Sequence, residues 1–295
     1  MTVGDAVPRQ GLFLRRFRFW RSGGSGRWML VAGLAVVLLL AIATVAALVA
    51  PPPGAFAGSL LERWKAPLEA GYLLGTDQLG RPLLARVLAG MPWSLGIALT
   101  AALISVGLGT LAGLAAAWAP GLTRRAILRL VDTVIAFPSL VIAVTVIAVL
   151  GRGFWPLALT LGLATWPIAA RVVYAEAMSV ARRDYVLAAQ LAGVGSVTIL
   201  ITHVLPALRP TLLVMLAFTF ADMLIAESAL SFLGLGVPLT APSWGNMLSE
   251  SREYLVEAPW MMLVPAGAIV LAVVALNLVG DGVAAISRRR ARDLA

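Results

Sequence analysis

The chain has 295 residues, of which 60% are hydrophobic and only 13% are charged, and its formal net charge is +9. A soluble domain of this length cannot bury so much apolar side chain, because its surface grows too quickly relative to its volume. The composition therefore indicates a membrane protein, and the absence of cysteine excludes disulfides, thiolate zinc sites and a cysteine nucleophile.

Single residues argue against several other function classes. His203 is the only histidine, which is too few for a histidine metal cluster, and Lys65 is the only lysine. The neighbours of Lys65 do not form a Walker A loop, so we expect this chain to bind neither ATP in that way nor a cofactor or metal. No Gly-x-Ser-x-Gly motif and no paired-carboxylate motif is evident, so we predict a chain that is not an enzyme and has no catalytic residues.

Six apolar segments are long enough to cross about 30 Å of hydrocarbon, which takes roughly 20 residues of helix. In chain order they are 28–49, 93–118, 133–150, 153–170, 211–233 and 258–280. Only the fifth carries charge, at Asp222 and Glu227, and the second contains Gly109-x-x-x-Gly113, a spacing that permits close helix contact. We therefore predict an all-α polytopic membrane protein with six transmembrane helices.

The arginines predict the orientation of these spans. With both termini in the cytoplasm, 17 of the 23 basic residues lie in inside segments, as the positive-inside rule requires. The predicted order is a cytoplasmic tail (1–27), the first span (28–49), an external loop (50–92), a five-helix core (93–286) and a basic cytoplasmic tail (287–295). The core holds a cytoplasmic loop, 171–210, and an external loop, 234–257. Because this placement accounts for the net charge, we expect no nucleic-acid partner.

The cytoplasmic segment 184–206 is apolar but interrupted. Asp184 is a good N-cap for a short helix over 185–192, which Gly193 and Gly195 are expected to end in the left-handed conformation. Ser196 then caps a second helix that Pro206 interrupts. The small face formed by Val186, Ala189 and Gly193 suits a groove on another protein. Packing against the chain's own spans is an equally good interpretation.

This segment resembles the loop signature of permease subunits of binding-protein-dependent ABC importers, which reads Glu-Ala-Ala, three residues, Gly, nine residues, Ile-x-Leu-Pro. The matching places are held by Ala188, Ala189, Gly193, Leu205 and Pro206. His203 stands in place of Ile, which is typical of the dipeptide, oligopeptide and nickel branch. Leu187 stands in place of Glu, which would complete a capping box after Asp184.

Three further segments resemble the same branch, in the same order. Segment 74–90 is similar to an external motif, with Gly75, Thr76, Asp77, Gly80 and Arg81 at the matching places and Pro82 where the branch has a second Asp. Segments 227–248 and 277–281 resemble the parts that follow the fifth span and end the last one. The motif at 74–90 indicates the second-type pore subunit, which works beside a different first-type subunit.

The resemblance implies a type I ABC importer permease fold in a bacterial-type inner (plasma) membrane. The implied partners are a second permease subunit in a heterodimer, two cytoplasmic ATP-binding subunits that hold ATP and Mg, an external substrate-binding protein and membrane lipid. The chain would form half of a pathway for short peptides, or for related small solutes such as nickel chelates. The ATPase-docking loop would comprise Asp184, Tyr185, Ala188, Ala189, Gly193, Gly195, His203, Leu205 and Pro206.

Asp222 and Glu227 leave two interpretations open. They are five residues apart, about 140° around a helix, so they do not share a face. Either they contact a substrate amino group or a cation along the pathway, or they form structural bonds in the bundle, with Glu227 near the outer interface. The alternative function is an ATPase-independent proton-coupled carrier or channel that uses both carboxylates, which would leave segments 184–206 and 74–90 unexplained.

Overall fold

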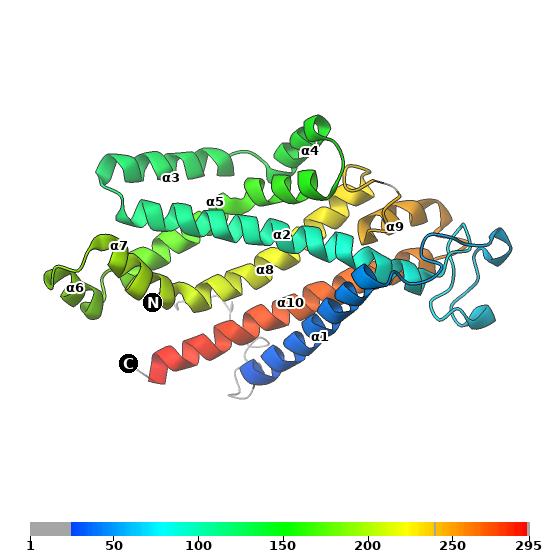
Figure 1. The fold of residues 1–295 in the computed structure, drawn as a ribbon, viewed down its shortest axis with the longest axis horizontal. Coiled ribbons are helices and arrows are strands. Elements are labelled where there is room, and N and C mark those ends of the chain that lie inside the picture. Colours follow the sequence, from blue (N-terminus) through cyan, green and yellow to red (C-terminus); the bar gives the residue numbers. More distant parts are fainter. Residues whose placement is uncertain (1–24, 239, 294–295) are drawn as a thin grey trace, which may run out of the picture.

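The computed structural model describes residues 25–238 and 240–293, which form an elongated bundle of helices (Figure 1). Most of the predicted tail 1–27 and the last two residues of the tail 287–295 lie outside the described residues. Within them there is no β-strand, only an isolated bridge between Thr76 and Pro82. The all-helical architecture predicted from the sequence is confirmed.

Five of the described helices are long and apolar enough to cross a membrane, when α8 is taken with the helical turns before it. They are α1 (Ser25–Val49), α2 (Leu83–Trp118), α5 (Phe154–Val180), α8 (Leu205–Phe232) and α10 (Trp260–Asp293). Each coincides with one predicted span. The ends differ most at α2, α5 and α10, because a hydropathy pattern reports only the part of a helix that suits hydrocarbon.

α2 begins ten residues before the predicted span, so the last ten residues of the predicted external loop 50–92 are helical. Pro82 precedes the helix and Pro92 lies inside it. Arg86 is buried although it is charged. Since a charged residue and a proline both argue against an apolar span, the sequence pattern placed the start of this helix too late.

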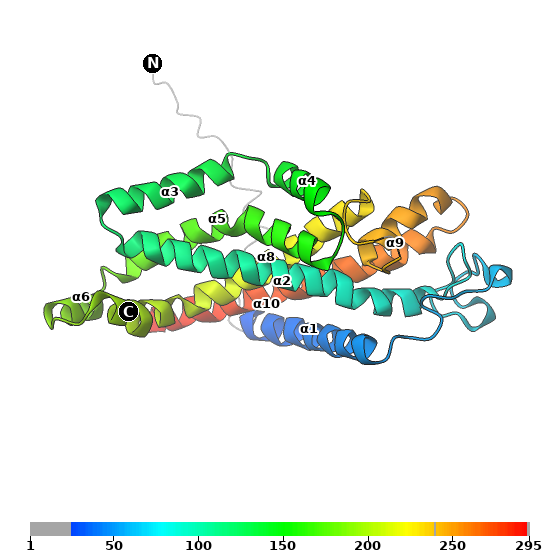
Figure 2. The same ribbon diagram turned by 45° about the horizontal axis from the view of Figure 1, so that its top comes forward.

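The third predicted span, 133–150, is not a single helix. It is divided between α3 (Gly121–Ile135) and α4 (Ser139–Leu150), with Pro138 between them. Proline has no N–H and disfavours a helical residue before it, so the chain breaks at this point. Together the two helices run alongside α5, in the direction opposite to it (Figures 1 and 2).

The contact between α2 and α5 is made through glycine. A β-carbon on Gly109 would lie 2.3 Å from the Ala169 β-carbon, and one on Gly113 would lie 2.6 Å from the Ala170 carbonyl oxygen. Larger residues would hold the two backbones apart. The close helix contact predicted from Gly109-x-x-x-Gly113 is therefore confirmed.

Glycine also joins α1 to α10. A β-carbon on Gly33 would lie 2.8 Å from the Ala275 carbonyl oxygen, and one on Gly282 would lie 2.7 Å from the Leu30 β-carbon. These contacts pair the beginning of α1 with the end of α10, so the two helices are antiparallel. The start of α1 and the end of α10 consequently point toward the same end of the bundle (Figure 1).

The shorter helices gather at the two ends of the bundle. One end, called the α6 end below, carries α6 (Asp184–Leu191), α7 (Ser196–Ile199) and a π-helical turn (Leu200–Val204). The other, called the α9 end, carries α9 (Trp244–Ser251) and 3₁₀ turns at Leu60–Glu62, Glu69–Gly71 and Arg252–Tyr254. The segments that resembled two family motifs therefore lie at opposite ends (Figure 1).

Candidate functional site

The loop after α5 folds back against the chain itself. Val186, in the middle of α6, is fully buried and belongs to a cluster with Val173, Val180 and Ile199. Ala189 packs against the same cluster. The face formed by Val186 and Ala189, which the sequence indicated for a groove on another protein, is thus used to hold α6 onto α5 and α7.

The opposite face of α6 is open. Leu187 and Leu191 are 42% and 91% exposed there, and Ala188 is exposed beside them. A helix that displays two large apolar side chains at the tip of a bundle offers a contact surface for another protein. Leu187, which stands in place of the signature glutamate, contributes to this outward face instead of capping the helix.

The helix α6 ends just before Gly193, which adopts the left-handed conformation. Gly193 has a φ of +75°, and the two hydrogen bonds of a Schellman motif close the helix. Val194 N–H donates to the Ala189 carbonyl over 3.1 Å and Gly193 N–H donates to the Gln190 carbonyl over 3.0 Å. The left-handed glycine predicted at 193 is confirmed, whereas the one predicted at Gly195 is wrong, since its φ is −60°.

The caps predicted for the two short helices are also wrong. Asp184 is the first helical residue of α6, Arg183 is the residue before it, and no side chain caps that end. Ser196 likewise begins α7 without capping it, and Gly195 precedes it. The sequence pattern located each helix to within one residue but placed each cap one residue too late. A cap is defined by the backbone conformation of one residue, so such a shift changes which side chain holds the position.

Pro206 does not interrupt the second helix as the sequence predicted. The helix continues from α7 into α8 through the π-helical turn Leu200–Val204, and Pro206 follows directly in the first turn of α8. His203 in that turn stacks on Tyr185 of α6, with ring centroids 6.2 Å apart and planes 21° apart. Its Nδ1 lies 2.7 Å from Thr202 Oγ1. The stack therefore places α6 against the turn that leads into α8.

At the α9 end, the external motif shapes a tight turn. Gly75 and Gly80 have φ values of +79° and +71°. A β-carbon on Gly80 would lie 1.9 Å from the Ser59 carbonyl oxygen. Thr76 is buried, where its Oγ1 accepts the Lys65 N–H over 2.9 Å and donates to the Glu62 carbonyl. The motif residues therefore fix the loop 58–82 as one folded unit.

Asp77 is the fully buried centre of an ion cluster in the same unit. Its Oδ1 accepts the backbone N–H groups of Leu79 and Arg81, each over 2.9 Å, and its Oδ2 accepts Arg81 Nε over 2.6 Å and Arg86 Nη1 over 2.9 Å. Since every oxygen of the carboxylate is satisfied, the buried charge is compensated.

Glu250 of α9 completes this cluster from the other external segment. Arg86 donates to its two oxygens over 2.6 and 3.1 Å, and Arg81 Nη2 donates over 3.2 Å. Burial raises the pKa of Glu250, but the hydrogen bonds and charge of Arg86 lower it more, so the pKa lies below its ordinary value of 4.5. The sequence analysis did not single out Arg86, although it lies within the segment 74–90, and did not connect Glu250 with that segment. The signal that could have identified Arg86 is a charged residue in the apolar stretch that leads into the span 93–118.

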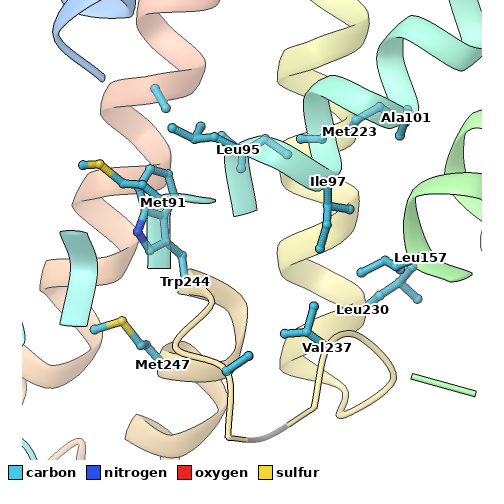
Figure 3. Packing of buried hydrophobic residues seen from close by; sticks show 14 of the residues in the cluster. Met91, Leu95, Ile97, Ala101, Leu157, Met223, Leu230, Val237, Trp244 and Met247 are labelled. Atoms are coloured by element: carbon cyan, nitrogen blue, oxygen red, sulfur yellow. The ribbon is translucent and has the colours of Figure 1, made fainter. Parts of the chain in front are cut away.

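A second contact seats the segment that begins α9 in the bundle. Trp244 is fully buried next to Met91 of α2 (Figure 3). Its indole N–H donates to the Val87 carbonyl over 2.9 Å, and its backbone N–H donates to Ser94 Oγ over 3.0 Å. This segment and the loop 58–82 together close the α9 end of the bundle.

Glu227 lies beneath this closure and is fully buried. Its carboxylate accepts Ser231 Oγ over 2.8 Å and Ser228 Oγ over 3.3 Å, and no basic side chain bonds to it among the described residues. A β-carbon on Gly245 would lie 2.5 Å from the Ser231 β-carbon. The surroundings agree with the structural interpretation of Glu227, in which hydroxyl groups hold the carboxyl group beside the outer segment.

Asp222 lies in a different environment from Glu227. Its side chain is exposed to a groove of about 300 Å³ between α2, α4, α5 and α8. Ser105, Thr165 and Thr219 line the same groove, and the hydroxyl oxygens of Ser105 and Thr165 are 3.0 Å apart. The structure thus separates the two carboxylates, because Asp222 borders this groove and Glu227 is buried.

Comparison with known proteins agrees with this arrangement. Residues 105–293 match the family model described as the inner membrane component of binding-protein-dependent transport systems. The chain is 38% identical to the di/tripeptide transport system permease protein DppC of Pseudomonas aeruginosa over 90% of its length and 88% of that protein. It is 33% identical to the nickel transport system permease protein NikC of Escherichia coli K12, over 87% and 92% respectively. It is 34% identical to the glutathione transport system permease protein GsiD of Pectobacterium atrosepticum, over 90% and 87%.

Proposed function

Because the chain belongs to the family of inner membrane components of binding-protein-dependent transport systems, we propose that it forms half of a pathway through which an ATP-driven importer moves short peptides. It is a permease subunit of the bacterial inner membrane, and its relatives serve peptide, nickel and glutathione transport. Short peptides are the favoured substrates, with nickel chelates and similar small solutes as variants.

The observation that carries the proposal is the outward face of α6. It presents Leu187 and Leu191 at the tip of the bundle, while Val186 anchors the helix on α5 and Tyr185 stacks on His203 in the turn before α8. In the proposed complex this face docks on one of two cytoplasmic ATPase subunits, which bind ATP and Mg. Closure of the ATPases then moves α6 and, through His203, the α8 helix.

Cross-linking tests this docking directly, since the chain has no cysteine. Leu191→Cys and Val256→Cys place a thiol at positions 91% and 90% exposed at opposite ends of the bundle. In membranes from the native host, a thiol cross-linker is expected to attach an ATPase subunit to Leu191→Cys, with a yield that changes when ATP is added. Val256→Cys is the control and should attach none. An intact complex with no ATPase on Leu191→Cys would contradict the docking.

We further propose that the chain crosses the membrane six times with both termini in the cytoplasm. The third crossing is the broken pair α3 and α4, and the outside is the α9 end, where the substrate-binding protein docks. A second, different permease subunit lines the other half of the pathway. A membrane-impermeant maleimide should label Val256→Cys in intact spheroplasts and Leu191→Cys only after lysis. The reverse order would overturn this topology.

Asp222 is proposed to contact the substrate within the pathway. Its exposed carboxylate, in a mostly apolar groove that also holds the hydroxyl groups of Ser105, Thr165 and Thr219, suits the ammonium group of a peptide. Asp222→Asn is expected to lower the saturated rate of dipeptide uptake several-fold while the amount of assembled complex stays the same. Glu227→Gln is the matched control and should leave that rate close to wild type. Equal effects of the two variants would argue against a specific role of Asp222.

A further inference from the structure

A second hollow in the bundle is apolar and lies away from the proposed pathway. It has a volume of about 690 Å³ and lies between α1, α2, α8 and α10. On α1 it is bordered by the stripe Leu30, Leu34, Val37, Ala41 and Val45. The glycine contacts hold α1 against α10 at Leu30 and Gly33, and the groove opens beside this contact, toward α8.

The shape of the groove suits one acyl chain. From Leu30 to Val45 it extends about 22 Å along α1, at a rise of 1.5 Å per residue. That exceeds the thickness of one leaflet, which is about half of a 30 Å hydrocarbon core. Among its lining residues only Thr44 carries a side-chain polar atom, and its hydroxyl donates to the Leu40 carbonyl over 2.7 Å. A groove without free polar groups does not hold water.

Apolar character alone would not distinguish a resident lipid from the surrounding bilayer. Two arginines beside the groove distinguish a specific lipid site from general contact with the bilayer. Arg27 lies three residues before Leu30 on α1, and Arg209 lies four residues before Leu213 on α8, so each is one turn beyond a lining residue on the same helix face. Both are exposed, and neither forms an ion pair within 25–238 or 240–293.

We propose that this groove binds an anionic phospholipid, with its acyl chain between α1 and α8 and its phosphate near Arg27 and Arg209. Arginine pairs with phosphate in a charge-assisted geometry, and basic residues at a membrane surface attract anionic headgroups. Both arginines lie toward the α6 end, so the lipid belongs to the leaflet on that side. Asp281 is exposed on α10 but does not line the groove. A lipid bound in this groove would fill the space between α1 and α8 that protein side chains leave open.

The test is lipid binding by the purified transporter complex, measured by native mass spectrometry. The probes are phosphatidylglycerol and phosphatidylcholine with identical acyl chains. Wild type is expected to prefer phosphatidylglycerol, and the double variant Arg27→Gln/Arg209→Gln should lose that preference at least several-fold. The matched control Arg125→Gln/Arg129→Gln removes two exposed charges from α3, away from the groove, and should keep it. Equal binding of the two lipids by wild type, or equal loss in both double variants, would overturn the proposal.

A second measurement separates lipid from protein as the occupant. Ala41 is exposed in the groove, so Ala41→Cys can carry a maleimide benzophenone. Irradiation of membranes should yield a lipid adduct on this chain. A cross-link to the second permease subunit would mean that a protein helix fills the groove. Both readouts are independent of transport, so they can fail while the ATPase docking at α6 stands, and the reverse also holds.

Discussion

Gly80 and Gly71 have similar backbone conformations but different surroundings. Their φ values are +71° and +83°, yet a β-carbon on Gly80 would meet the Ser59 carbonyl oxygen at 1.9 Å, whereas one on Gly71 would have no neighbour within 4 Å. Gly71→Ala should therefore cost only the left-handed conformation, about 1–2 kcal/mol. Gly80→Ala should cost clearly more, measured as a lower thermal midpoint of the purified complex. Equal shifts would mean that Ser59 does not confine this turn.

Glu250 makes the stability of the outer segments depend on pH. Its pKa is below 4.5, so its contribution is present above the ordinary pKa and is lost as pH falls through the lowered pKa. Glu250→Gln is expected to cost about 1.5–3 kcal/mol at neutral pH, the range for hydrogen bonds to charged groups. It should also flatten the loss of stability below about pH 4.5, followed by thermal unfolding at several pH values.

The exposed pair Lys65–Glu69 provides the comparison for Glu250. Its atoms are 3.0 Å apart, but both side chains are open to solvent, and such pairs contribute little. Glu69→Gln should therefore leave the unfolding midpoint unchanged at neutral pH. If it destabilised the protein as much as Glu250→Gln, burial of the Asp77, Arg86 and Glu250 cluster would not be the source of the effect.

Glu227 is predicted to be structural. Glu227→Gln keeps the shape and hydrogen-bonding capacity of the side chain, so ATP-driven uptake should stay within about twofold of wild type. Glu227→Ala leaves the hydroxyl groups of Ser228 and Ser231 without this partner and opens a cavity, with an expected loss of about 2–5 kcal/mol. The check combines uptake assays with thermal unfolding. Abolished uptake in a stable Glu227→Gln complex would favour a proton-relay role.

At the scale of elements, glycines govern how closely α2 and α5 approach. A β-carbon on Gly113 would lie 2.6 Å from the Ala170 carbonyl, while one on Gly107 in the same helix would have no neighbour within 4 Å. Gly113→Leu should separate the helices and cost about 1–3 kcal/mol or more, the range for overpacking. Gly107→Leu adds the same side chain on an open face and should be tolerated. Unfolding of the purified complex measures both, and equal losses would contradict the glycine contact.

The sequence predicted elements well where one physical factor decides them. Continuous apolar runs identified five long helices, and the left-handed glycine at 193 fixed the corner after α6. The prediction failed where two factors compete. Apolar composition favoured a third span over 133–150, but Pro138 broke it. The orientation of α6 could not be read from its small face, because the cluster around Val186 that decides it comes from several elements.

At the scale of the whole molecule, the sequence could not show which distant residues meet. The motif around Asp77 was predicted as a unit, but its partner Glu250 is 164 residues from Arg86 along the chain. Likewise, the sequence placed Asp222 and Glu227 on different faces of one apolar segment, but only packing shows that one borders a groove and the other is buried beneath the outer closure. Folding thus divides the molecule into an anchored α6 end, a groove that holds Asp222 and a closed α9 end.

If this chain transports as part of an ATP-driven complex, purified complex in proteoliposomes should take up a labelled dipeptide when the binding protein is outside and ATP is inside. We expect this uptake to require both ATP and the binding protein and to persist when a protonophore collapses the proton gradient. Uptake driven by a proton gradient without ATP, by this chain alone, would overturn the ATP-driven function and favour the carrier that uses Asp222 and Glu227.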